Sequence, residues 1–144
     1  MQTSRWRYAL RAMGRLAAQP SRPVGAGVLA RAAGGDEKFM YAILRRLVDA
    51  GLLHSARGRI GGYRLARPPG EITAFEVVDA VDPERTVSPC TARAPGRACD
   101  ICRGGTDCLV RRALDDAEAA FFDVLRSRTL IDIAETATSG ELLG

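Results

Sequence analysis

The four cysteines of this 144-residue chain fall within nineteen positions, at Cys90, Cys99, Cys102 and Cys108. The segment that holds them, PCTARAPGRACDICRGGTDC, is rich in Gly, Pro and Arg and nearly lacks large apolar side chains. Such a segment has little core of its own, so we expect a group bound by the sulfurs, or a partner surface, to order it. Thiolates at this density suit iron–sulfur clusters and zinc, and sets of four cysteine ligands serve both.

The spacing of the cysteines separates these kinds of site. Cys-x8-Cys-x2-Cys-x5-Cys contains one C-x2-C pair, whereas a zinc ribbon has two, so the pattern favours an iron–sulfur cluster over zinc. The alternative is a metal-free thiol switch, in which Cys99 and Cys102 form a disulfide or react with an electrophile. The first residues do not have the pattern of a secretory signal, so we expect a cytoplasmic protein, in which cysteines do not pair by default.

Charge is divided unevenly along the chain that must position these cysteines. Residues 1–70 carry thirteen Lys or Arg and three Asp or Glu, whereas residues 71–144 carry eight and fourteen, so the two parts hold net charges of +10 and −6 within a total of +4. This division favours a nucleic-acid-binding part followed by an effector or oligomerisation part. A solvated basic surface without a nucleic-acid partner would have the same charge.

Helical periodicity covers most of the first fifty residues. Apolar side chains recur on one side of residues 5–18, an Ala-rich helix is expected over 24–33, and a third helix over 37–50 begins at the predicted N-cap Asp36. Two short helices joined by a glycine turn predict a helix-turn-helix, whose second helix enters the major groove of DNA. The candidates for DNA contact on that helix, which would otherwise form a solvated face, are Lys38, Tyr41 and Arg45.

A glycine-rich hairpin is predicted directly after the third helix. Two short strands, Leu52–Ser55 and Tyr63–Ala66, flank the turn ARGRIGG. A hairpin in this place is a wing, and Arg57 and Arg59 lie at its tip, where they suit a narrow, electronegative minor groove. Thr73 then begins a helix with a capping box.

A long helix is predicted after the cysteines, followed by a short one over Ser127–Ala134. Apolar residues on the long helix repeat at intervals of four, three, four and three, which is the heptad seam of a helix that packs on another helix. They are Val110, Leu114, Ala117, Phe121 and Val124. The seam suits pairing with a copy of itself or packing on the chain's own core. We favour a homodimer, since the preceding domain is small.

The wing and its flanks resemble a known family. The stretch AGLLHSARGRIGGYRLARPPGEITAFEVVDAVD, with its pattern RG-x-x-GGY-x-LA, resembles the Rrf-type family of bacterial winged-helix transcription regulators, and RYALRAMGRLA resembles that family's first helix. The resemblance covers about residues 5–134. It implies a mainly α fold with a small β-hairpin wing, a winged helix-turn-helix followed by a long C-terminal dimerisation helix. Cluster-binding members hold an iron–sulfur cluster with three loop cysteines, which match Cys90, Cys102 and Cys108 by position.

The resemblance leaves the fourth cluster ligand open. Some family members use a His three residues after the last cysteine, where this chain has Arg111, and others use an acidic residue in the first helix, where it has Arg7. Arginine does not ligate iron. Cys99 is therefore the candidate fourth ligand of a 2Fe–2S or 4Fe–4S cluster.

Together these features predict a homodimeric, sequence-specific transcriptional repressor. Its binding to a pseudo-palindromic operator in double-stranded DNA would be controlled by an iron–sulfur cluster that reports redox state, nitric oxide or iron; the alternative is a metal-free cysteine-thiol redox sensor of the same fold. The competing class is an interaction or electron-carrying protein, against which the basic first half argues. We expect no enzyme and no small-molecule substrate, since the chain has one His, no phosphate-binding loop and no Ser-His-Asp set. We expect no membrane partner, since no apolar stretch reaches the length of a membrane-spanning helix.

The expected organisation has four parts. A DNA-binding domain is expected over 1–82, a sensor loop over 83–108, the dimerisation helix and a short terminal helix over 109–134, and a flexible tail over 135–144.

Overall fold

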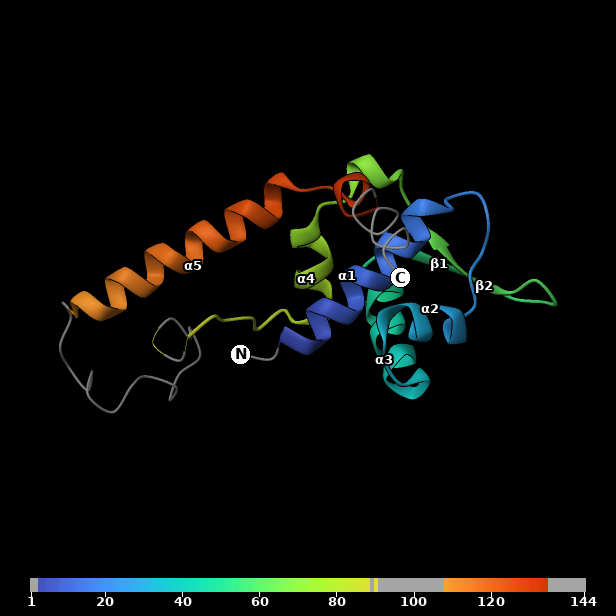
Figure 1. Cartoon of the computed structure of the whole chain (residues 1–144), viewed down its shortest axis with the longest axis horizontal. Coiled ribbons are helices and arrows are strands. Elements are labelled where there is room, and N and C mark those ends of the chain that lie inside the picture. The colour runs from blue at the N-terminus through green and yellow to red at the C-terminus, as the bar shows by residue number, and fades with distance from the viewer. Residues whose placement is uncertain (1–2, 89, 91–107, 135–144) are drawn as a thin grey trace, which may run out of the picture.

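The computed structural model describes residues 3–88, 90 and 108–134 (Figure 1). Over these residues the chain is mainly helical with one two-stranded hairpin, as the sequence predicts. The elements are α1 (Thr3–Ala18), α2 (Ala26–Ala33), α3 (Glu37–Asp49), β1 (Leu53–Ala56), β2 (Gly62–Leu65), a short 3-10 helix η1 (Pro69–Glu71), α4 (Ala74–Val81) and α5 (Leu109–Ser127). Residues 130–134 are also helical. Among the described residues, no helix is long and apolar enough to cross a membrane.

One apolar core joins α1, α2, α3 and α4. The inner side of α3 is apolar, since Met40, Ile43, Leu44 and Leu47 are buried and Val48 is half-buried. They belong to one cluster with buried residues of the other helices and the hairpin. These include Trp6, Met13, Leu16, Leu29, Leu53, Val77, Val78 and Leu130. Burial of each large apolar side chain contributes about 2 kcal/mol, so the core holds the helices in one arrangement.

The turn between α2 and α3 fixes the direction in which α3 begins. Gly34 has a φ of +74°, a left-handed conformation that glycine adopts without strain. Gly35 is constrained in another way, because a Cβ there would lie 2.8 Å from a ring carbon of Tyr8. Asp36 caps α3 as predicted, and its side chain accepts a hydrogen bond from the Phe39 N–H at 3.1 Å.

The hairpin pairs β1 with β2 in antiparallel register, from Leu53 opposite Leu65 to Ala56 opposite Gly62. Each strand lies one residue closer to the turn than the sequence predicts. At the first strand the reason is visible, because the Leu52 N–H completes the end of α3 by donating to a carbonyl of that helix at 2.9 Å. The end of α3 therefore leads into the wing without a linker.

The C-terminal end of α5 is held against the start of α4. The Ala74 N–H donates to the Arg128 carbonyl at 2.8 Å, and the Leu130 N–H donates to the Ile72 carbonyl at 3.0 Å. Because these residues pair with the α4 segment, the helix expected over Ser127–Ala134 begins only at residue 130, and that predicted start is wrong. From this attachment α5 extends away from the winged domain (Figure 1).

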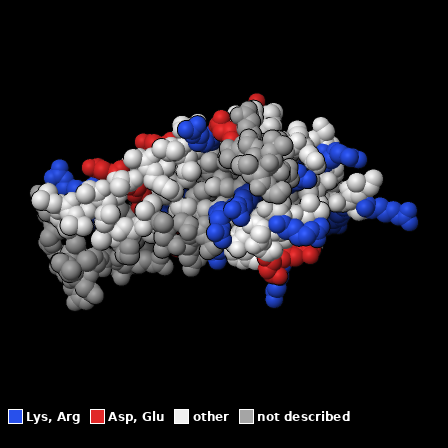
Figure 2. Space-filling model, viewed as in Figure 1, with Lys and Arg blue, Asp and Glu red and all other residues white. Residues whose placement is uncertain are grey.

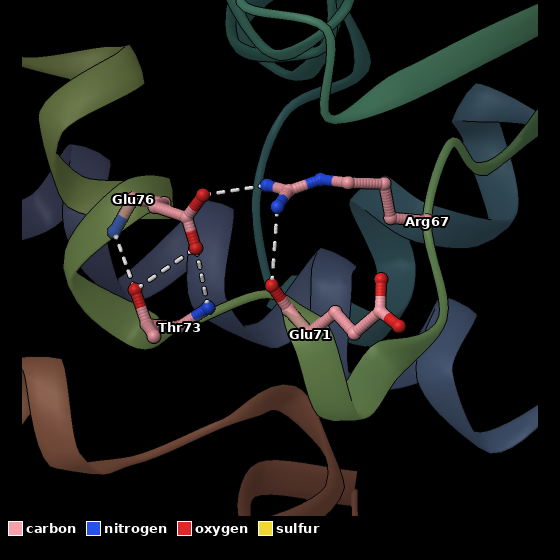
Figure 3. A network of polar contacts seen from close by, with 4 residues as sticks. All are labelled: Arg67, Glu71, Thr73 and Glu76. Atoms are coloured by element: carbon pink, nitrogen blue, oxygen red, sulfur yellow. Dashed lines mark hydrogen bonds and ion pairs between the residues drawn. The ribbon is translucent and has the colours of Figure 1, made fainter.

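α4 begins with the predicted capping box, which Figure 3 shows together with Arg67. The Thr73 hydroxyl accepts from the Glu76 N–H at 3.2 Å, and a Glu76 carboxylate oxygen accepts from the Thr73 N–H at 2.8 Å. Arg67, just after the wing, donates to the other carboxylate oxygen at 2.5 Å and to the Glu71 carbonyl at 3.2 Å. This network ties the end of the wing to the start of α4.

We expect a Glu76→Gln variant to lose part of the acid-side pH dependence of stability. Burial acts to raise the pKa of Glu76, but hydrogen bonds from Thr73 and Arg67 and the charge of Arg67 outweigh it, so the pKa lies below its ordinary value of 4.5. Since the folded-state pKa is the lower one, the stabilisation is present above the unfolded pKa and is lost as the pH falls through the folded pKa.

Urea unfolding of both proteins from about pH 6 down to about pH 3 measures this effect as the free energy of unfolding. A Thr73→Ala variant, which loses the cap, should be destabilised by about 1 kcal/mol even at neutral pH. Glu84→Gln is the control at an exposed position. The network would have no electrostatic role if the Glu76→Gln protein kept the pH dependence of the unmodified chain.

Candidate functional site

α3 has an exposed polar face opposite its buried one. Lys38, Tyr41 and Arg45 lie three or four residues apart and all are exposed, Tyr41 at 51%. A helix with such a face, placed after a short helix and a tight turn, has the geometry of the second helix of a helix-turn-helix. The structure thus brings the three predicted α3 residues together on one side of one helix.

The wing, residues 53–65, is anchored at its base and projects at its tip. Val24 and Tyr63 exchange two backbone hydrogen bonds of 2.9 Å, so the segment before α2 lies along the edge of β2. Arg57 and Arg59 follow β1 in the turn and are exposed. Figure 1 shows the hairpin projecting from the helices, and Figure 2 shows many Lys and Arg side chains at that end of the molecule.

The Tyr63 phenol of the wing is influenced by its own burial and by Tyr41 of α3. Burial raises the pKa of the Tyr63 phenol, and the electrostatic influence of Tyr41 raises it further. Tyr41 of α3 thus acts electrostatically on a phenol of the wing. Tyr63 keeps its proton at neutral pH and can donate a hydrogen bond.

The segment that leads into the cysteines is fixed to α5 by Glu118. One carboxylate oxygen of Glu118 accepts hydrogen bonds from the Val87 N–H at 2.8 Å and from the Thr86 hydroxyl at 3.2 Å. Shortly after, the Cys90 N–H donates to the Ser88 hydroxyl at 3.2 Å. The backbone just before Cys90 is therefore tied to the middle of α5.

Two of the four cysteines lie among the described residues. Cys90 and Cys108 are not in a disulfide, and both are partly exposed. Cys108 is the N-cap of α5, and its carbonyl accepts the Arg112 N–H at 3.0 Å. Cys99 and Cys102 lie outside the described residues. Within the described part of the chain, no three His, Cys, Asp or Glu side chains are grouped to hold a metal ion, and the four-cysteine ligand set stays a prediction.

An aromatic cluster connects α1, α4 and α5. The ring centroid of Phe122 lies 6.2 Å from that of Trp6 and 5.8 Å from that of Phe75. Arg85 lies over the rings of Phe75 and Phe122, at 4.5 and 5.2 Å from their centroids. The Trp6 indole N–H also donates to Asp82 at 3.1 Å. The cluster and the polar contacts hold the residues after α4 between α1 and α5.

The predicted seam of α5 is largely exposed. Val110 is 63% exposed, Val124 56% and Phe121 39%, and Ala117 is exposed as well, whereas Leu114 is half-buried. The described residues therefore leave most of this apolar side of α5 uncovered.

Sequence analysis does not identify Glu118 or Arg85 as parts of the site. The two acceptor contacts of Glu118 reach residues 31 and 32 positions earlier, a separation at which no local pattern exists. For the aromatic cluster the sequence does contain one signal, because Phe121 and Phe122 are adjacent. Successive helical residues point in directions about 100° apart, so one of the two must face away from the seam and toward the chain's own core.

Comparisons with known proteins agree with this arrangement. The family model described as "Rrf2: Iron-dependent Transcriptional regulator" matches residues 2–136. Protein aau3 of Rhizobium meliloti is 35% identical over 135 residues, which cover 92% of this chain and 84% of that protein. The HTH-type transcriptional regulator IscR of Vibrio atlanticus is 32% identical over 129 residues, which cover 89% of this chain and 71% of that protein.

A solved structure shows the same fold. CymR (YrzC), described as the global cysteine regulator of B. subtilis, matches with a TM-score of 0.71 at 27% identity, over 92% of this chain and 94% of that one. The predicted winged-helix fold is thus confirmed. The family model and IscR are described as transcriptional regulators, a kind of protein that is not an enzyme, which agrees with the prediction for this chain. Matched over almost its whole length, the chain belongs to the Rrf2 family of transcriptional regulators.

Proposed function

We propose that this chain is a homodimeric, sequence-specific DNA-binding repressor, whose affinity for its operator depends on an iron–sulfur cluster held by the cysteine loop. The observation that carries the proposal is the attachment of the segment before Cys90 to α5, through Glu118, in a chain that also carries a basic α3 and wing. The description of the family as iron-dependent supports it. The division into parts at 1–82, 83–108, 109–134 and 135–144, and a cytoplasmic location, belong to the same proposal.

For DNA binding we propose that α3 enters the major groove and the wing enters the adjacent minor groove. Lys38 and Arg45 supply donors and positive charge for base edges or phosphates, and Tyr41 adds a phenol. Arg57 and Arg59 stand on a thin projection, which suits a narrow groove of negative potential. The net charge of +10 on residues 1–70 supports the attraction to DNA.

The proposed partner of α5 is a second copy of the chain. Val110, Phe121 and Val124 expose apolar surface on one side of a 19-residue helix, and association of two such sides removes that surface from water. A two-fold dimer would present two copies of α3 to one face of the DNA, about 34 Å or a little more apart. We therefore expect a pseudo-palindromic operator.

The thiol donors of the chain fit an iron–sulfur cluster. Cys90 and Cys108 are both partly exposed and outside any disulfide, and thiolate sulfur is the usual ligand of 2Fe–2S and 4Fe–4S clusters. When bound, such a cluster supplies sensitivity to oxygen, nitric oxide or iron supply. The proposed ligands are Cys90, Cys102 and Cys108, with Cys99 as the fourth.

The contacts of the chain suggest how the loop would act on the DNA-binding parts. Cys90 lies three residues after Val87, which Glu118 binds, and Cys108 is the first residue before α5. Both ends of the cysteine loop are thus attached to the helix that carries the seam. A loop that is held or released would change the position of α5 and, in a dimer, the spacing of the two wings.

A second candidate is a metal-free thiol switch of the same fold. The partial exposure of Cys90 and Cys108 supports it, and so does the similarity to CymR, described as the global cysteine regulator of B. subtilis. In this candidate, the affinity for the operator changes when the cysteines are oxidised, and not when a cluster is lost.

Protein purified without oxygen tests both candidates. The proposal expects a coloured, iron-containing dimer that selects a pseudo-palindromic sequence from a pool of randomised duplexes, and whose affinity for that duplex changes when the iron is removed. A colourless, iron-free protein that selects the same duplex and responds to oxidant would instead favour the thiol switch. A protein that selects no sequence would contradict both.

An Arg57→Ala substitution is expected to weaken binding to the selected duplex by about 1–3 kcal/mol if Arg57 enters the groove. An arginine that only contacts a phosphate would mainly lower the slope of log Kd against log salt, by about one. Fluorescence anisotropy in a salt series separates the two effects. Arg128→Ala removes the same charge at an exposed position after α5 and serves as the control. Unchanged binding of the Arg57→Ala protein at every salt concentration would refute the role of the wing.

A further inference from the structure

We infer that Ile60, in the turn of the wing, is an apolar contact that the wing places in the minor groove of DNA. The inference rests on the proposed DNA-binding function and adds to it a residue whose contribution is not electrostatic. Ile60 is 84% exposed, the largest value among the exposed large apolar side chains of the described residues. Removal of such a side chain from water is favourable wherever a partner surface covers it.

The distribution of exposed apolar side chains supports this inference. Within the described residues, five of the eight large ones lie on α5 or shortly after it: Leu109, Val110, Phe121, Val124 and Ile131. The other three are Val28 on α2, Tyr41 on α3 and Ile60 on the wing, and the last two lie on the elements proposed to bind DNA. A single exposed apolar residue is common in proteins. Ile60 is distinguished by its place on a projecting turn, next to Arg59.

The two sides of the hairpin lie close together at this turn. The Gly61 N–H donates to the Gly58 carbonyl at 3.0 Å, which closes a tight turn, and Gly58 has a φ of +120°, which favours glycine. A Cβ at Gly61 would lie only 2.8 Å from the Ala56 carbonyl oxygen. The two sides of the hairpin therefore approach more closely than side chains would allow. Arg59 and Ile60 are the side chains that this thin turn presents.

A narrow turn with one cation and one apolar side chain at its centre suits the minor groove. The groove is about 6 Å wide, its negative potential attracts arginine, and its walls are deoxyribose rings that offer apolar surface. Apolar side chains inserted into the minor groove, isoleucine among them, are a recurrent device of DNA-binding proteins. Arg57 and Arg59 would guide the turn into the groove, and Ile60 would be covered there by sugars and base edges.

The test uses the full-length chain and the duplex that it selects from a randomised pool. Ile60→Ala and Ile60→Thr are expected to bind about tenfold more weakly at every salt concentration, with an unchanged salt slope, because a neutral side chain displaces no counterions. Arg59→Ala, at the neighbouring position, is the matched control and should lower the salt slope by about one. Thermal unfolding of the Ile60 variants should match that of the unmodified protein, because Ile60 is so exposed.

Hydroxyl-radical cleavage locates the contact, since these radicals attack deoxyribose hydrogens that line the minor groove. At saturating protein, the unmodified chain should protect the sugars under the turn, and the Ile60→Thr protein should lose that protection while it keeps protection elsewhere. Equal affinity and equal protection for the unmodified and Ile60→Thr proteins would overturn the inference and leave the DNA-binding function standing. An unmodified protein that selects no duplex would show instead that the proposed function itself is wrong.

Discussion

A Val124→Asp substitution is expected to convert the proposed dimer into a monomer and to lower operator affinity by about a hundredfold or more, since a monomer cannot occupy both half-sites at once. Val124 is 56% exposed on the apolar side of α5 and contributes little to the chain's own core. In the proposed dimer its side chain would be covered by the partner helix. A carboxylate there would lose its hydration without gaining a counter-charge, which strongly opposes association.

Ala119→Asp is the matched control for this experiment. Ala119 is exposed, and with about 3.6 residues per turn it lies on the side of α5 opposite the seam. The same charge change at that position should leave the dimer intact. Light scattering after gel filtration gives the oligomeric state, and anisotropy with the selected duplex gives the affinity. A Val124→Asp protein that remained dimeric would show that the seam does not form the interface.

The parts of the fold that follow local rules could be predicted from the sequence. Asp36 lies immediately before the helix that it caps, and Thr73 lies three residues before its capping partner Glu76, so each signal and its effect are close in sequence. The start of the last helix was not predictable in this way. Residue 130 begins it because Arg128 and Leu130 pair with the segment before α4, and that pairing exists only in the folded chain.

In the candidate site, too, some features follow from local sequence and others depend on the folded chain. The exposed residues of α3 and the wing follow from periodicity and glycine spacing, and the structure places Lys38, Tyr41 and Arg45 on one face. Glu118 could not be predicted, because its role depends on Val87 and Thr86, which reach it only when the chain after α4 lies along α5. Sequence patterns thus identify the surfaces that face outward. The contacts that connect those surfaces require the fold.

Cys90→Ser and Cys108→Ser are each expected to lower the iron bound by protein purified without oxygen to less than about one tenth of that in the unmodified chain, because serine is a poor substitute for a thiolate ligand. Both residues are partly exposed and neither is in a disulfide, so the substitutions should cost the fold little. Iron and sulfide assays and the visible absorption spectrum measure the loss, and circular dichroism verifies that the helices remain.

Cys99→Ser tests the fourth ligand, because the chain has Arg7 and Arg111 at the two positions that the family resemblance implies for it. Loss of iron in this variant, equal to that in Cys108→Ser, is expected if Cys99 binds the cluster. Full iron content in Cys99→Ser, with loss in the other two, would assign the fourth position to another group and keep the cluster. Full iron content in Cys90→Ser or Cys108→Ser would contradict the ligand set itself.

A different result would favour the thiol switch. If the unmodified protein contains no iron but responds to oxidant, and the serine variants no longer respond, these thiols act by their own oxidation. The attachment of the loop to α5 through Glu118 would serve either chemistry, so the iron assay decides between them.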